Sequence, residues 1–254
     1  MGFTMRRGNT TVIWVSVVLA AVVVAGVSFS LLVLDRQPRR HVAEPGASTS
    51  SLLTLTWGPS LCAVDESNSG CRSGHVGRMG SVFVLHGLWP QPATEQYCDL
   101  PRRSRETKRP VELPDDLRAR LEAQMSDAKV MATHEWYAHG TCSGVTAPEY
   151  FQIAAALTDQ ANSVLDPLFS RAAGREISAR TVRAEFDARF GANTGQRVTL
   201  SCRDSGGRTP LVYEVRLSLP KVTELRSATD PLSLRDALAR GPAVPAGCGR
   251  GHVP

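Results

Sequence analysis

The chain has 254 residues and a formal net charge of +5, with 42% hydrophobic and 21% charged residues, a composition typical of a globular protein. Most of the excess charge lies in residues 1–40, where five arginines face one aspartate, while the remainder has 24 basic and 23 acidic residues. The overall charge therefore does not by itself indicate a nucleic-acid-binding protein, and any electrostatic footprint must be local.

The N-terminal segment at residues 10–34 has no charged residue and consists mostly of Val, Ala, Leu, Ile and Phe. It is long enough to span a bilayer as a helix, and it exceeds the apolar region of an ordinary cleavable signal peptide. We expect a transmembrane signal anchor after a cytoplasmic N-terminus at residues 1–9. All six cysteines follow the segment, which indicates disulfides in an oxidising compartment. The expected location is the cell membrane with the domain outside the cytoplasm, or secretion if the segment is cleaved.

Residues 35–51 are rich in Arg, Pro, Gly, Ser and Thr, which predicts a flexible linker before one domain at residues 52–254. Alternation over Leu52–Trp57 predicts a strand, and the apolar run Ser81–Leu85 predicts a buried strand that ends at His86. We expect a loop through Cys62 and Cys71 between these strands. Residues 99–114 predict a surface loop with a basic cluster: Arg102, Arg103, Arg105, Lys108 and Arg109.

Helical spacing dominates the middle of the chain. It predicts four helices: one from Pro114 past Leu121, one over Asp127–His139 that stops at Gly140, one over Pro148–Leu165, and one over Ser178–Phe190. Alternating strands follow at residues 197–202 and 211–219, joined by a turn at residues 205–207. Helices in the middle and strands at both ends favour an α+β fold with a central antiparallel sheet flanked by several helices.

Two short segments concentrate the candidate chemistry: His86-Gly87-Leu88-Trp89-Pro90 and His134-Glu135-Trp136-Tyr137-Ala138-His139-Gly140-Thr141-Cys142. Histidine exchanges protons near neutral pH, and Glu135 and His139 are four residues apart on one predicted helix face. The segments therefore suggest acid–base chemistry on a substrate that an indole could stack against. We expect Trp136 to pack in the core, whereas Trp89 follows the predicted strand, at a junction where sites often occur.

Two other enzyme classes share features with these segments. A zinc protease needs His-Glu-x-x-His, but the spacing here is His-Glu-x-x-x-His, which separates the two histidines around the helix. Residues 140–144 mimic a Gly-x-nucleophile-x-Gly elbow with Cys142 as nucleophile, although that elbow requires a strand before the turn. We expect no metal ion and no cofactor, and a disulfide rather than a reactive thiol at Cys142.

The two segments resemble the active-site segments of the ribonuclease T2 family, and the resemblance extends over roughly residues 50–250. The chain is similar to a bacterial-type member. The resemblance implies a metal-free endoribonuclease of low base specificity that forms 2′,3′-cyclic phosphate ends. The resemblance implies that His86 is the acid and His139 the base, that Glu135 and His134 serve the transition state and phosphate, and that Trp89 lines a base pocket. The implied partner is RNA, bound by a monomeric ectodomain.

Cysteine pairing is a further expectation. We favour Cys98–Cys142 because it would tie the two active-site segments together, and the resemblance implies Cys62–Cys71 and Cys202–Cys248 as the other pairs.

One departure from the family pattern opens an alternative function. The family usually has lysine immediately before the second catalytic histidine, where this chain has Ala138, and an acidic residue often stands where it has Gln91. Loss of one transition-state contact can lower a rate by ~10²–10³. The alternative is therefore an RNA-binding or partner-binding module with weak or lost catalysis.

Overall fold

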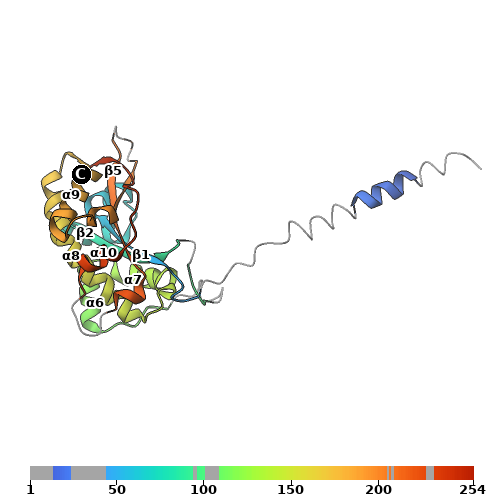
Figure 1. Ribbon diagram of the computed structural model, residues 1–254, viewed down its shortest axis with the longest axis horizontal. Coiled ribbons are helices and arrows are strands. Elements are labelled where there is room, and N and C mark those ends of the chain that lie inside the picture. Colours follow the sequence, from blue (N-terminus) through green and yellow to red (C-terminus); the bar gives the residue numbers. More distant parts are fainter. Residues whose placement is uncertain are drawn as a thin grey trace, which may run out of the picture. The chain divides into compact units, whose positions relative to one another are not determined.

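The computed structural model describes residues 14–23, 44–93, 96–100, 109–204, 206, 209–226 and 232–254. The chain divides into two compact units, Met1–Val42 and Ala43–Pro254. Residues 14–23 of the first unit form a helix (Figure 1), and no helix among the described residues is long and apolar enough to cross a membrane. The rest of the predicted anchor lies outside the described residues. Residues 44–51, which we expected to be linker, join the second unit, where Gly46 donates a hydrogen bond to the Cys142 carbonyl.

The second unit is built on a six-stranded sheet with the order β2-β1-β5-β6-β3, in which β4 also pairs with β5. The strands are β1 (Ser50–Trp57), β2 (Phe83–Gln91), β3 (Glu176–Ser178), β4 (Val198–Arg203), β5 (Leu211–Pro220) and β6 (Arg250–His252). The pairings are antiparallel except for one parallel contact between Leu211 of β5 and His252 of β6. The predicted α+β class is confirmed, and part of the predicted turn at residues 205–207 lies outside the described residues.

The two faces of β1 have different roles. Leu53, Leu55 and Trp57 are fully buried in the main core, and the indole of Trp57 packs 5.0 Å from the ring of Phe83 and 5.3 Å from that of Phe169. Thr54 and Thr56 alternate onto the opposite face. This period of two is why the strand is amphipathic, and it leaves one face of the sheet available for polar chemistry.

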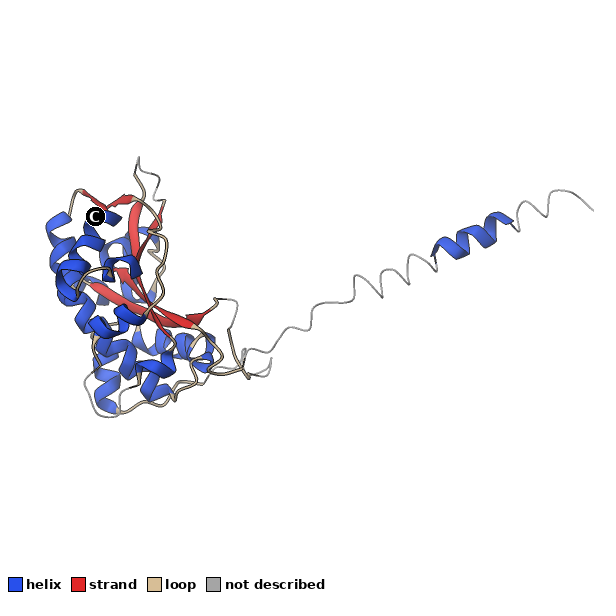
Figure 2. Ribbon diagram, in the orientation of Figure 1, coloured by secondary structure: helices blue, strands red, loops and turns tan. Residues whose placement is uncertain are grey.

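The helices that contribute buried residues to the main core pack beside the sheet (Figure 2). They are α6 (Asp115–Glu122), α7 (Ala128–Ala138), α8 (Ala147–Ala172), α9 (Ala179–Phe190) and α10 (Leu234–Arg240). A capping box of Thr146 and Glu149 begins α8, and the Ser178 side chain caps α9 by accepting from Thr181. The α8 helix continues past the predicted end at Leu165, because Leu168 and Phe169 remain buried against the core.

Two expectations about local structure were wrong. The predicted loop after β1 contains the short helices α2 (Gly58–Val64), α3 (Ser69–Arg72) and α4 (His75–Met79). Strand β2 does not end at His86 but continues to Gln91, paired with β1. Helix α7 stops before Gly140, as predicted, and Gly140 begins a 3-10 turn, η2 (Gly140–Cys142). Two more such turns are η3 (Thr194–Arg197) and η4 (Val222–Leu225).

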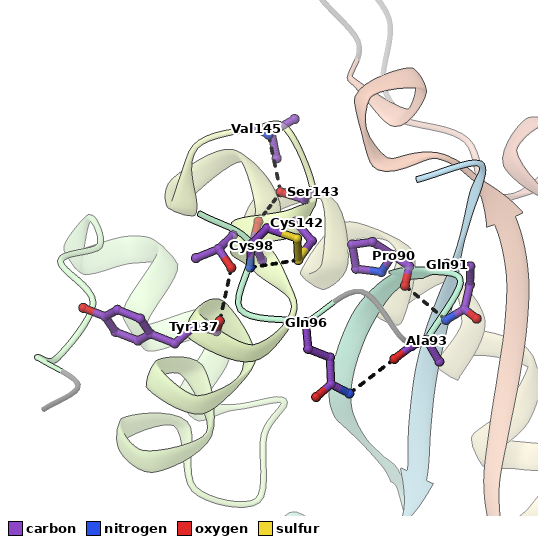
Figure 3. The surroundings of a disulfide bond; sticks show 11 residues. Pro90, Gln91, Ala93, Gln96, Cys98, Tyr137, Cys142, Ser143 and Val145 are labelled. Carbon is purple, nitrogen blue, oxygen red and sulfur yellow. Dashed lines mark hydrogen bonds between the residues drawn. A yellow bond between two sulfur atoms is a disulfide. The ribbon is translucent and has the colours of Figure 1, made fainter. Parts of the chain in front are cut away.

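Three disulfides tie the domain together: Cys62–Cys71, Cys98–Cys142 and Cys202–Cys248. These are the three pairings favoured above. Figure 3 shows how Cys98, in the segment after β2, reaches Cys142 at the turn after α7. Next to this bridge, Tyr97 donates a backbone hydrogen bond of 3.0 Å to the Ala138 carbonyl. The end of α7 is therefore fixed to the chain that leaves β2.

Candidate active site

A bulge in the sheet positions His86. Thr54 pairs with Gly87 and Leu55 pairs with Leu85, so the register shifts and His86 is the extra residue of β2. Such bulges redirect a side chain and increase local twist. The result places the His86 imidazole on the polar face of the sheet, within reach of Glu214 on β5.

The His86 ring lies between two buried carboxylates. Its Nδ1 is 3.0 Å from Glu214 Oε1, and its Nε2 is 3.8 Å from Glu135 Oε1. Burial by itself lowers the pKa of His86, but the Glu214 hydrogen bond and the charges of Glu135 and Glu214 outweigh it, so the pKa is raised above 6.5. The site thus stabilises the imidazolium form of His86.

Glu135 connects the two sequence segments. Its carboxylate is fully buried, and the Trp89 indole donates a 2.8 Å hydrogen bond from Nε1 to Glu135 Oε2. His134 Nε2 lies 3.9 Å from Glu135 Oε1. Gly87 makes this approach possible, because a Cβ there would lie 1.9 Å from Glu135 Oε2. The glycine therefore belongs to the geometry of the site rather than to a turn.

His139 has the opposite protonation preference. It ends α7, with its ring centroid 5.2 Å from that of Trp89 and 6.5 Å from that of His134. Burial, followed by the positive charges of His134 and His86, lowers the pKa of His139 to about 4. The Trp89 ring also lies 5.0 Å from the ring of His86. The indole consequently contacts one histidine that is neutral at pH 7 and one whose charged form is stabilised.

The structure brings together every residue of the predicted site: His86, Trp89, His134, Glu135 and His139. Cys142 is in a disulfide, so the cysteine-nucleophile alternative is wrong. Trp136 packs against the core and 5.9 Å from the Tyr150 ring, as expected. In the basic loop only Arg109 belongs to the described residues; the other four basic residues of that cluster do not.

Glu214 and Arg216 are site residues that lie outside the two sequence motifs. Glu214 accepts hydrogen bonds from His86 and from Nε and Nη2 of Arg216, at 2.9 and 2.6 Å. A signal was present, because two charged residues spaced by two interrupt an apolar strand and must share one face. Their distance in sequence from both motifs, 128 residues between His86 and Glu214, concealed their role.

A cavity of about 180 Å³ opens beside His86. Its lining includes Thr56, Asp65, Asn68, Ser126 and Tyr213. Polar groups and an aromatic ring next to the imidazole are suited to a polar, flat ligand group. A second cavity, of about 280 Å³, lies between α6 and α7 and is lined by other residues, among them Leu113 and Lys129.

The model of the Ribonuclease T2 family matches residues 49–229 of the chain. A ribonuclease of Aeromonas hydrophila is 27% identical over 199 residues, which cover 76% of this chain and 82% of the relative. Ribonuclease MC of Momordica charantia is 28% identical over 156 residues, covering 56% of this chain and 74% of the relative.

Solved structures show the same fold. RNase NT in complex with 5′-AMP aligns with a TM-score of 0.54 at 20% identity, over 82% of this chain and 98% of that one. Ribonuclease MC1 from the seeds of bitter gourd aligns with a TM-score of 0.50 at 23% identity, over 66% and 87%. Together with the family match over most of the folded unit, these likenesses lead to one conclusion: the chain belongs to the Ribonuclease T2 family.

Proposed function

We propose that the domain is an endoribonuclease that cleaves RNA without a metal ion, by transesterification to 2′,3′-cyclic phosphate ends, with low base specificity. The observation that carries this proposal is the pair of histidines around Trp89 whose pKa values are shifted in opposite directions. Transesterification needs one group that accepts a proton and another that donates one. At any pH between the two pKa values, His139 is neutral and His86 is positively charged.

His139 acts as the general base. It removes the proton of the ribose 2′-hydroxyl, and the oxygen attacks the adjacent phosphorus, forming the bond that closes the cyclic phosphate. His86 acts as the general acid and gives its proton to the departing 5′-oxygen as the P–O bond breaks. Glu214 binds Nδ1 of His86, so Nε2 is the atom that donates. DNA lacks the 2′-hydroxyl and is not a substrate for this step.

Glu135 and His134 support the transferring phosphate, and Trp89 binds a base. The hydrogen bond from Trp89 to Glu135 fixes the orientation of the indole. An indole that stacks on a base does not contact the hydrogen-bonding edge of that base, which accounts for low base specificity. The 180 Å³ cavity beside His86 is placed to accept the nucleoside that leaves with the 5′-oxygen.

Location and assembly belong to the same proposal. We place the domain outside the cytoplasm, as a monomer, anchored by the N-terminal segment or secreted after its cleavage, as in a bacterial-type member. Three disulfides with no free cysteine among the described residues support an oxidising compartment. Fractionation of cells that express the full chain tests this, since recovery in the cytoplasmic fraction with reduced cysteines would contradict it.

The activity is tested by incubating residues 41–254 with RNA in excess EDTA and analysing the new 3′ ends. We expect cleavage with cyclic phosphate ends. Loss of cleavage with EDTA and recovery with zinc would contradict the mechanism. The second candidate, an RNA-binding module without efficient catalysis, is favoured by Ala138 and predicts RNA binding without product.

A further inference from the structure

Glu214 and Arg216 form a charged pair on the polar face of β5. They pair across the sheet with Thr56 and Thr54 of β1, whose other neighbour is β2 with His86 and Trp89. Arg216 is the only residue of β5 that is not buried. The carboxylate of Glu214 is 2% exposed, and it binds His86 through Oε1 and Arg216 through Oε2. Imidazole, carboxylate and guanidinium are therefore coupled in one row.

The Arg216 guanidinium lies where a phosphate can reach it. Its Cζ is 5.4 Å from the centroid of the Trp89 ring, which also contacts both His86 and His139. The side chain is 33% exposed. A guanidinium has five N–H donors, and the two bonds to Glu214 leave three for another acceptor. Arginine forks match phosphate oxygens well.

The structure has no room for a cationic side chain at position 138. Ala138 is only 2% exposed. Its carbonyl accepts a hydrogen bond from the backbone amide of Tyr97, next to the Cys98–Cys142 bridge. A lysine side chain there would have to displace packed neighbours. The site nevertheless needs positive charge, because Glu135 and Glu214 are buried carboxylates and a phosphodiester adds a further negative charge.

We propose that Arg216 is the cation that stabilises the phosphorane transition state in place of a lysine at position 138, and that Glu214 is the positioning residue that holds both Arg216 and His86. This inference rests on the proposed function. The bond to Glu214 fixes the guanidinium before substrate arrives, so its charge acts in the transition state without reorganisation.

The test compares Arg216→Met and Arg216→Lys with a matched control, Arg250→Met. Arg250 of β6 forms an ion pair of 3.6 Å with Glu176 of β3. These two strands lie at the end of the sheet that is farthest from β2. We expect Arg216→Met to lower kcat by ~10²–10³, Arg216→Lys to recover part of that loss, and Arg250→Met to leave kcat unchanged. Affinity for an uncleavable 2′-deoxy oligonucleotide should fall less than affinity for the transition-state mimic uridine–vanadate. A kcat of Arg216→Met close to that of the wild type would overturn the proposal.

A double-mutant cycle separates contact with the phosphate from mere neutralisation of Glu214. If Arg216 only neutralised the charge of Glu214, then adding Arg216→Met to a Glu214→Gln variant would leave kcat unchanged. That result would show the proposal to be wrong. We expect the loss to persist in that background, which also folds without an unpaired buried carboxylate.

Uridine–vanadate binding also keeps the two proposals distinguishable. A wild-type chain that cleaves no RNA contradicts the proposed function. In that case the wild-type chain and Arg216→Met are compared for binding of uridine–vanadate. Tight binding by the wild type that is lost in Arg216→Met still supports the Arg216 contact, and equal binding by the two proteins contradicts it.

Discussion

Replacing Glu214 with glutamine should change the acid strength of His86 directly. The substitution keeps the size of the side chain and removes its charge, which reaches His86 Nδ1 through a 3.0 Å hydrogen bond. Hydrogen bonds to charged groups contribute roughly 1.5–3 kcal/mol, so the substitution removes a stabilisation of the imidazolium of about that size. The pKa of His86 should therefore fall, because the effects of burial and of the Arg216 charge then dominate.

The measurement is a proton NMR titration of the His86 imidazole in the absence of RNA. The control is Glu176→Gln, which removes an arginine-paired carboxylate from the far edge of the sheet and should leave the pKa of His86 unchanged. At pH 7.5 the smaller protonated fraction of His86 should also lower kcat/KM, with a smaller loss at lower pH. A pKa of His86 that stays at its wild-type value in Glu214→Gln would refute this account of the site's electrostatics.

Three more outcomes follow from the geometry. The pH dependence of kcat/KM should be bell-shaped, rising as pH passes the His139 pKa of about 4 and falling above the raised pKa of His86, so that a plateau at alkaline pH would count against these roles. Gly87→Ala should lower the free energy of unfolding by roughly 1–3 kcal/mol and weaken the Trp89–Glu135 bond, whereas Gly77→Ala, with open space around its Cβ, serves as the control in urea denaturation. Ala138→Lys should destabilise the domain and give no gain in turnover, because Ala138 is buried; a stable, faster variant would show that the site lacks a cation.

Local sequence signals predicted those parts of the fold that depend on neighbouring residues. Ser178 predicts the start of α9 because its side chain accepts from a backbone amide of the first turn, and Gly191 follows the last helical residue with a positive φ. Alternation located β1 and β5 because apolar side chains such as Leu53 and Val215 alternate with polar ones such as Thr54 and Glu214, although both faces of these strands are buried. The α2–α4 helices were missed because each is short and lacks an extended apolar period.

The site was predicted only where its residues lie in the two motifs. The motifs place Glu135 and His139 on one helix, but no local pattern shows that β2 bulges at His86 or that β5 lies close enough for Glu214 to bind it. Those contacts depend on strand order and register, which are set by packing across the whole sheet. Position 138 is a further example: the helical pattern does not show that Ala138 is buried, at 2% exposure.

A dinucleotide with sulfur in place of the bridging 5′-oxygen distinguishes the general acid His86 from the general base His139. A thiolate leaves without a proton, so such a substrate needs a general base but no general acid. We expect His86→Ala to lose several orders of magnitude of kcat on the ordinary dinucleotide and little on the sulfur analogue, and His139→Ala to lose activity on both. Equal loss of activity on the sulfur analogue in both variants, or its retention only in His139→Ala, would contradict the assignment.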